Sequence, residues 1–210
     1  MMRRLVYLYA VLLSGCELLP VTEAPAITPT IEPQAAWAQH QSQLNSLEAW
    51  TLDGRISMRQ DEEAWHASLQ WQQIDSAYHI NLFGPFGQGA LRLDGSPQSV
   101  ILQHDGETVQ SDDAEQLLRQ QVGLQVPVNG LRYWAVGLAA PGSDYKEELD
   151  QEGRLAVLQQ NGWRVRYRGY VAVKGFMLPG KIFLDRDGLD VRLVVDQWQV
   201  VGSSLERLDG

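Results

Sequence analysis

The chain has 210 residues, of which 17 are Lys or Arg and 26 are Asp or Glu, and its formal net charge is −9. This length favours one domain with a leader segment, and an apolar content of 44% is sufficient for a folded core. An acidic balance argues against nucleic-acid binding and against a polybasic patch that attracts anionic lipid.

The first 15 residues have the features of a targeting segment. Arg3 and Arg4 precede an apolar run, residues 5–13, that is too short to span a bilayer as a stable helix. Leu13-Ser14-Gly15-Cys16 follows and resembles the lipobox of bacterial lipoproteins. Cys16 is the only cysteine, so it cannot form an internal disulfide. We predict a signal peptide over residues 1–15 and a lipidated Cys16; an ordinary signal peptide with an incidental cysteine is the alternative.

An anchor of this kind needs no help from surface charge. Burial is worth about 0.8 kcal/mol per methylene, and two or more acyl chains give stable attachment. Residue 17 is Glu, whereas an aspartate there resembles the inner-membrane retention signal of bacterial lipoproteins, so the outer membrane is expected. Residues 16–34 carry four prolines and are predicted to be an extended tether.

Period-two alternation dominates the first half of the folded part. A helix is predicted over residues 35–49, where Trp37, Leu44 and Leu47 recur at helical spacing. Alternating apolar residues then predict strands, with Gly54 as a bend. The predicted strands are Trp50 to Met58, Trp65 to Trp71, Tyr78 to Leu82, Ala90 to Leu93, Val100 to Gln103 and Glu107 to Gln110.

The third of these strands ends in Gly84-Pro85-Phe86-Gly87. Proline at the second position and glycine at the fourth are typical of a type I turn. This turn exposes a bulky phenylalanine where loops usually carry small polar residues. A Phe86 that folds back under the sheet is the alternative.

Two helices are predicted in the middle of the chain. Ser111 or Asp112 can cap a helix that runs to Val122, and Glu115 lies at the capping-box spacing from Asp112. Val126-Pro127-Val128 is predicted to be extended. A second short helix is predicted over residues 131–138, followed by a loop over 139–144.

The last part returns to strands that flank Asn-Gly and Asp-Gly turns. Trp198 falls on the opposite parity from Leu189, Val191, Leu193 and Val195, which predicts a bulge near Gln197. The tail from residue 202 is expected to fray. The predicted strands are Leu155 to Gln160, Trp163 to Tyr170, Lys181 to Asp185 and Leu189 to Trp198.

About ten or eleven antiparallel strands with one apolar face must close on themselves or be covered. We therefore predict one strongly curved sheet wrapped around a few helices over residues 35–201. Its inner side is either a packed core or a ligand cavity. The candidates for the inner side are Trp50, Trp65, Leu69, Trp71, Tyr78, Ile80, Leu82, Trp134, Trp163 and Tyr167.

The order of short motifs along the chain resembles the LolB family of outer-membrane lipoprotein receptors. No single motif is specific, but their order covers essentially the whole mature domain. The matching pieces are the lipobox at Cys16, Trp37-Ala38-Gln39-His40, Gly54-Arg55, Trp71-Gln72-Gln73, Tyr78, Gly84-Pro85-Phe86-Gly87, Asp112-Asp113-Ala114-Glu115, Pro127-Val128, Leu131 to Leu138, Pro141-Gly142, Asp144-Tyr145, Gly153-Arg154-Leu155, Gly162-Trp163, Tyr167, Gly169-Tyr170, Leu178-Pro179 and Trp198.

The resemblance implies an incomplete antiparallel barrel with a helical lid and an apolar interior that takes acyl chains. The ten inner candidates named above are therefore expected to line an acyl-chain cavity. It implies a monomer that accepts triacylated lipoproteins from the LolA carrier and inserts them into the outer membrane, without nucleotide or cofactor. The family's protruding loop carries a leucine needed for the membrane step, and the matching residue is Phe86. The change keeps bulk and hydrophobicity, so we expect the role to persist.

Two other functions are compatible with parts of the chain. A periplasmic hydrolase would need a catalytic motif, but there is no nucleophile elbow, zinc cluster or glycine-rich phosphate loop. His66 and His79 fall on the polar parity of their strands, and the carboxylates near residue 112 are explained by helix capping. An assembly lipoprotein could instead dock an acidic partner on an arginine stripe, although a solvated strand face is the favoured explanation of the stripe. The stripe consists of Arg164, Arg166 and Arg168.

Overall fold

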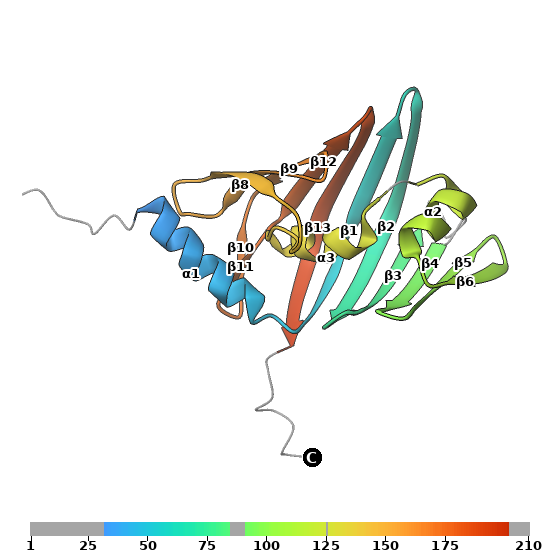
Figure 1. The fold of residues 1–210 in the computed structure, drawn as a ribbon, viewed down its shortest axis with the longest axis horizontal. Helices are drawn as coiled ribbons and strands as arrows, with labels where there is room; N and C mark the ends of the chain where they lie inside the picture. The colour runs from blue at the N-terminus through green and yellow to red at the C-terminus, as the bar shows by residue number, and fades with distance from the viewer. Residues whose placement is uncertain (1–31, 85–90, 125, 202–210) are drawn as a thin grey trace, which may run out of the picture. The chain divides into compact units, whose positions relative to one another are not determined.

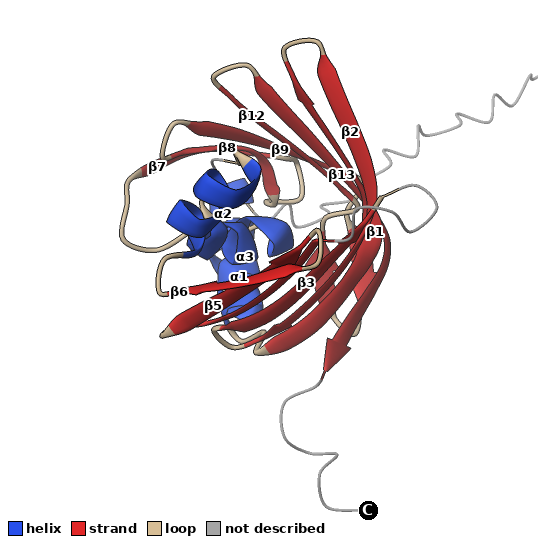
Figure 2. Ribbon diagram, turned by 90° about the vertical axis from the view of Figure 1, so that its right-hand side faces the viewer, coloured by secondary structure: helices blue, strands red, loops and turns tan. Residues whose placement is uncertain are grey.

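The computed structural model describes residues 32–84, 91–124 and 126–201, which lie within one compact unit of residues 31–210. Eleven antiparallel strands form one sheet that curls around the helices (Figures 1 and 2). The sheet does not close, because β6 and β7 lie at its two ends. The predicted incomplete barrel is therefore confirmed.

The strands of the main sheet follow the order β6-β5-β4-β3-β2-β1-β13-β12-β9-β8-β7. A separate hairpin is formed by β10 and β11. The bounds are β1 (Ala49–Gln60), β2 (Glu63–Ile74), β3 (Ala77–Phe83), β4 (Leu91–Ser96), β5 (Ser99–His104), β6 (Glu107–Ser111), β7 (Tyr145–Leu149), β8 (Leu155–Gln160), β9 (Trp163–Arg168), β10 (Val171–Val173), β11 (Phe176–Leu178), β12 (Lys181–Arg186) and β13 (Leu189–Val201).

The three helices α1 (Pro33–Asn45), α2 (Ala114–Val122) and α3 (Val128–Val136) lie on the concave side of the sheet (Figure 2). Asp113 caps α2, because its side chain accepts a hydrogen bond from Gln116 N (2.9 Å). The prediction of a cap at residue 111 or 112 was therefore wrong. The third helix begins at Val128, which the sequence predicted to be extended, and not at Leu131 as predicted.

The bulge predicted near Gln197 is present. The register of β1 and β13 pairs Asp53 with Gln197 and then Gly54 with Val195, so Asp196 has no partner across the strands. Beyond the extra residue, the side chains of β13 point to the opposite faces of the sheet from those that the alternation before it predicts. Trp198 therefore points to the concave side, where it is buried. Gly54 is required here by space, since a Cβ on it would lie 2.5 Å from Val194 O.

Three strands were not predicted. The sequence of β7, Tyr-Lys-Glu-Glu-Leu, does not alternate cleanly, and an edge strand of this kind is mostly exposed. The β10–β11 hairpin turns through Lys174 and Gly175, both with positive φ. It begins after Arg168, where the sequence predicts a strand that continues to Tyr170.

The core lies between the sheet and the helices, and all of its buried members fall between residues 37 and 200. Every buried core residue that the structure describes therefore belongs to the compact unit of residues 31–210. One tryptophan cluster joins Trp50 to Trp71 (ring centroids 5.0 Å apart) and to Trp198 (5.3 Å). A second pair, Trp134 and Trp163 (6.2 Å), fixes α3 to β9.

Buried polar contacts fix two of the helices. Gln160 on β8 is 2% exposed, and its Oε1 accepts hydrogen bonds from Trp134 Nε1 and Ala140 N at 2.8 Å each. Gln160 Nε2 donates to Ala140 O at 2.7 Å. Trp37 Nε1 donates to Glu147 Oε2 (2.9 Å), which joins α1 to β7. These bonds join α3 to β8 and α1 to β7.

The start of α1 packs tightly against the turn between β7 and β8. Gly153 has a φ of +71° there, and a Cβ on it would lie 2.5 Å from the Cβ of Ala36.

Within residues 32–84, 91–124 and 126–201, no helix is long and apolar enough to cross a membrane.

Candidate functional site

The concave side of the sheet is not filled completely. A cavity of about 750 Å³, which we call the mouth pocket, opens beside the tip of the β1–β2 hairpin. Its volume falls within the range of about 300 to 1,000 Å³ typical of ligand sites. The described residues that line it are Met58, Gln60, Glu63, Ala64, Trp65, Leu82, Leu91, His104, Val122, Gly123, Leu124 and Leu189.

Strand register positions the apolar wall of the mouth pocket. Met58 on β1 lies opposite Trp65 on β2, and Leu82 on β3 lies opposite Leu91 on β4. These residues share the inward parity of their strands, so their side chains point to the concave side. Trp65 remains 38% exposed, which leaves a large apolar surface at the opening. The wall can therefore bury an apolar chain that enters from solvent.

The end of α2 forms the opposite side of the pocket. Gly123 ends the helix in the left-handed conformation, with φ 71°, and Leu124 N donates to Leu118 O (3.3 Å). This turn brings Val122 and Leu124 to the pocket. Leu117 and Leu118 are the buried residues of α2, so two side chains mainly hold this short helix in place.

Polar groups lie at the pocket as well as apolar ones. Gln60, Glu63 and His104 are among the lining residues, and His104 Nε2 lies 3.3 Å from Asp105 Oδ2. An apolar wall with a few polar groups suits a ligand that has long hydrocarbon chains and a polar head.

Comparison with known proteins identifies the family. A family model described as "Outer membrane lipoprotein LolB" matches residues 48–198. The chain belongs to the LolB family. It is 41% identical to the outer-membrane lipoprotein LolB of Nitrosococcus oceani over 192 residues, which cover 90% of this chain and 93% of that protein. The LolB of Pseudomonas syringae pv. syringae is 38% identical over 196 residues, 93% of this chain and 94% of that protein.

The fold is shared more widely than the sequence. A crystal structure of a LolA superfamily protein from Nitrosomonas europaea superposes with a TM-score of 0.54 at 10% identity, covering 86% of this chain and 98% of that chain. This similarity shows the common fold. Membership of the LolB family makes the protein an outer-membrane lipoprotein.

The structure places the ten predicted inner residues of this LolB-family chain in two environments. Trp65 and Leu82 line the mouth pocket. The other eight belong to the packed core or lie against it, and none is among the described lining residues: Trp50, Leu69, Trp71, Tyr78, Ile80, Trp134, Trp163 and Tyr167. Burial raises the pKa of Tyr78 to about 12, and it raises the pKa of Tyr167 as well.

Several lining residues were missed by sequence reasoning. Met58 and Leu189 could have been found from the sequence, because both lie on the apolar face of predicted strands. Val122 and Leu124 could not, since their place at the pocket depends on where α2 packs. The structure describes only the first residue of the predicted membrane loop, Gly84, which follows β3. Residues 85–87, which include Phe86, lie outside the described residues. Cys16 lies outside them too.

The described residues contain no group of three or more His, Cys, Asp or Glu that could hold a metal ion. His79 is half-buried on the outer side of β3, where its Nδ1 pairs with Asp94 and its Nε2 lies 3.0 Å from Asn81 Nδ2. His66 is exposed on the outer side of β2. Both positions agree with the polar parity that the sequence predicts.

Proposed function

We propose that this LolB-family protein receives triacylated lipoproteins from a LolA-type carrier and inserts them into the outer membrane. In this proposal the mouth pocket holds acyl chains during the transfer. A receptor of this kind carries out no bond chemistry. Its task is to keep hydrocarbon out of water between two partners.

The observation that carries the proposal is the mouth pocket itself. It is a partly open cavity of about 750 Å³ on the concave side, and Trp65 stands half-exposed at its opening. Burial of apolar area stabilises by about 25 cal/mol per Å², so the pocket favours a hydrocarbon ligand over water. Its opening beside a hairpin tip gives a chain a route to enter from a carrier.

Release requires that the bilayer binds the chains better than the pocket does. A ligand moves in the direction of its greater affinity, and no nucleotide is needed for that. A partly open pocket supports this step, because it buries less hydrocarbon than a bilayer. Gly84 lies at the start of the predicted membrane loop, and insertion of Phe86 into the lipid would bring the loop to the bilayer.

The experiment follows a labelled lipoprotein from its carrier to this protein and then to liposomes. Trp65→Glu places a charge at the pocket opening and should weaken capture about tenfold or more, since burial of such a side chain is worth roughly 1.5–3 kcal/mol. Ile74→Glu is the matched control, because Ile74 is 51% exposed on the same strand and does not line the pocket. Equal capture by both variants would contradict the proposal.

The lipid anchor has a separate role in this proposal. A soluble chain that starts after the leader and carries Cys16→Ala should still take lipoproteins from the carrier, because the pocket lies wholly within the compact unit. Its delivery to membranes should be slower. Loss of capture would mean that the anchor does more than tether the domain.

A further inference from the structure

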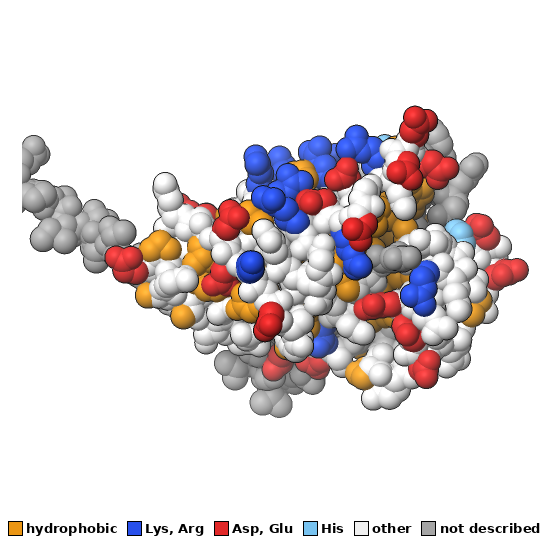
Figure 3. Space-filling view, turned by 45° about the horizontal axis from the view of Figure 1, so that its top comes forward, with side chains coloured by type: hydrophobic (Ala, Val, Ile, Leu, Met, Phe, Trp, Pro, Cys, Tyr) orange, Lys and Arg blue, Asp and Glu red, His pale blue; other side chains and the backbone are white. Residues whose placement is uncertain are grey.

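The outer face of the sheet concentrates positive charge that the proposed function does not use. The outward parity of four neighbouring strands contributes these side chains, and Figure 3 shows Lys and Arg gathered near the top of the domain. We call them the basic face. Seven of the chain's 17 basic residues belong to it: Arg164, Arg166 and Arg168 on β9, Lys181 on β12, Arg192 on β13, and Arg55 and Arg59 on β1.

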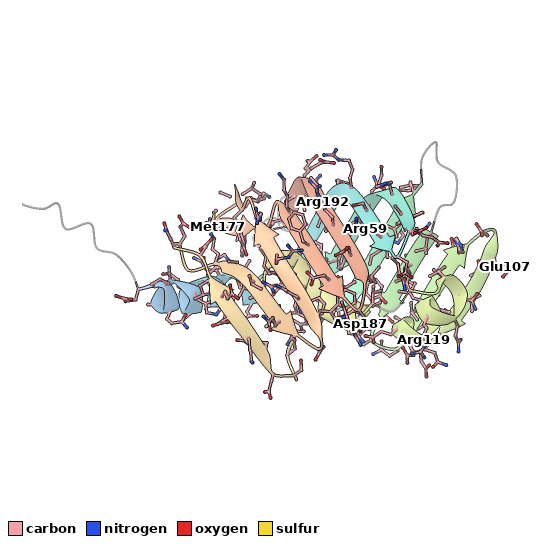
Figure 4. The ribbon with its side chains drawn as sticks, turned by 90° about the horizontal axis from the view of Figure 1, so that it is seen from above. Arg59, Glu107, Arg119, Met177, Asp187 and Arg192 are labelled. Carbon is pink, nitrogen blue, oxygen red and sulfur yellow. The ribbon has the colours of Figure 1, made fainter. Side chains whose placement is uncertain are left out.

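Strand register brings like charges together on the basic face. Arg168 lies directly opposite Lys181, a pairing that destabilises a sheet. Phe183 lies opposite Arg166 on one side and Arg192 on the other, and each guanidinium carbon is 5.6 Å from its ring centroid. Figure 4 labels Arg59 and Arg192, which lie over the adjacent strands β1 and β13.

Acidic side chains neutralise only part of this charge. Asp196 pairs with Arg55 at 2.7 Å, and Asp190 pairs with Arg59 at 2.9 Å. Asp185 lies 3.3 Å from the Arg166 guanidinium. The remaining four cations have no carboxylate within ion-pair distance among the described residues: Arg164, Arg168, Lys181 and Arg192. The face is thus positive in a chain with a net charge of −9.

The basic face contains a hollow with the chemistry of a phosphate site. A shallow pocket of about 690 Å³ is lined by Arg192 on β13, by Arg55 and Ser57 on β1, and by His66 and Ser68 on β2. Asp196 already holds the Arg55 guanidinium through two hydrogen bonds, so Arg192 is the lining arginine that has no carboxylate partner among the described residues. A guanidinium group binds phosphate oxygens in a bidentate manner, and hydroxyl groups add further donors. The same pocket reaches Phe83 and Gly84, where the predicted membrane loop begins.

We propose that the basic face binds the phosphate groups of an anionic phospholipid bilayer. A bilayer fits better than an acidic protein, because the cations spread over four strands and the ring of Phe183, which lies among them, is half-buried. Protein interfaces instead centre on buried apolar anchors. The hollow of this face also reaches Gly84, the first residue of the predicted loop. The inference extends the proposed function, since it says which face of the domain meets the membrane.

Co-sedimentation with vesicles tests the inference on the chain that runs from Glu17 to Gly210, which has no acyl anchor and contains all of the core residues that the structure describes. Binding is compared for vesicles of phosphatidylcholine with and without phosphatidylglycerol. We expect binding only when the anionic lipid is present. High salt should abolish it, since the screening length falls to about 3 Å at 1 M.

Charge removal then locates the binding face. A basic residue near an anionic surface contributes about fivefold to membrane affinity, so Arg168→Gln with Arg192→Gln should weaken binding about 25-fold. The matched control is Arg119→Gln with Lys146→Gln, which removes two exposed charges from α2 and β7 and should leave affinity within about twofold. All four positions are exposed, so each variant should keep the circular dichroism of the parent chain.

Three outcomes would overturn the inference. The first is binding that does not depend on phosphatidylglycerol, and the second is an equal loss in both pairs of variants. The third is unchanged vesicle binding together with lost capture from the carrier, which would assign the basic face to an acidic protein partner. Failure of the proposed function looks different, because it would appear as absent capture by the unmodified chain whatever the vesicles contain.

Discussion

Replacement of Gln160 by alanine should weaken the attachment of α3 to the sheet. The expected loss in the free energy of unfolding follows from the hydrogen bonds of this one side chain. The carboxamide satisfies two buried donors, Trp134 Nε1 and Ala140 N, at 2.8 Å each. Trp134 is 1% exposed and Ala140 is 8% exposed, so water does not replace the lost partner in the folded state. Each buried donor that is left without an acceptor costs about 1–3 kcal/mol. Two such donors give a loss of about 4 kcal/mol in the free energy of unfolding.

Urea denaturation followed by tryptophan fluorescence measures this loss. A domain of this size loses about 2–4 °C of melting temperature per kcal/mol, so a fall of about 8–16 °C should accompany it. The control is Gln159→Ala on the same strand, where the side chain is exposed and the expected change is within about 0.5 kcal/mol. A difference between the variants of under about 1 kcal/mol would refute the reasoning, because the buried network would then not hold α3.

Three further predictions concern pH, packing and the membrane loop. Burial and, secondarily, Arg154 lower the pKa of His40 below its ordinary value of 6.5. The unfolded chain therefore binds the proton first, so stability should fall as pH drops below about 6.5, and His40→Gln should flatten that part of the stability profile. Gly153→Ala should destabilise the domain by about 3 kcal/mol more than Gly142→Ala, because both residues have positive φ but only the first meets α1. Unfolding curves of the two variants that coincide would contradict this. Phe86→Glu should leave capture from the carrier intact and block delivery to liposomes, whereas Phe86→Leu should deliver normally.

Local pattern predicted most of the sheet because most strands bury one face. Trp163, Val165 and Tyr167 alternate with arginines, and the structure buries all three. Tyr145 to Leu149 forms a strand with no such signal, since an edge strand is held by its backbone bonds to β8 more than by side-chain burial. A strand of that kind becomes visible only when its neighbour is in place.

The candidate site was harder to predict than the fold. Parity showed that Trp50 and Trp65 both point inward, and the structure places one in the core and the other at the pocket. Whether an inward side chain meets a helix or open space depends on the packing of α2 and α3, which no local pattern encodes. The lining residue Leu124 follows from that packing alone.

Net charge gave no indication of the basic face. The count of 26 acidic against 17 basic residues averages over the whole surface. Arg164, Arg168 and Arg192 gather only because β9, β12 and β13 are neighbours in the sheet. Composition excludes a uniformly basic protein, but it does not exclude a basic patch on an acidic one.

The absence of pairing between β6 and β7 affects how the sheet can change its width. In a closed barrel, the number of strands and their stagger fix the diameter, and a wider barrel requires that a row of backbone hydrogen bonds breaks. With β6 and β7 at its two ends and not paired with each other, the sheet of this protein is not subject to that constraint. In the proposed function, a lipoprotein with two acyl chains or three could then be held by one fold without the loss of a single cross-strand pair.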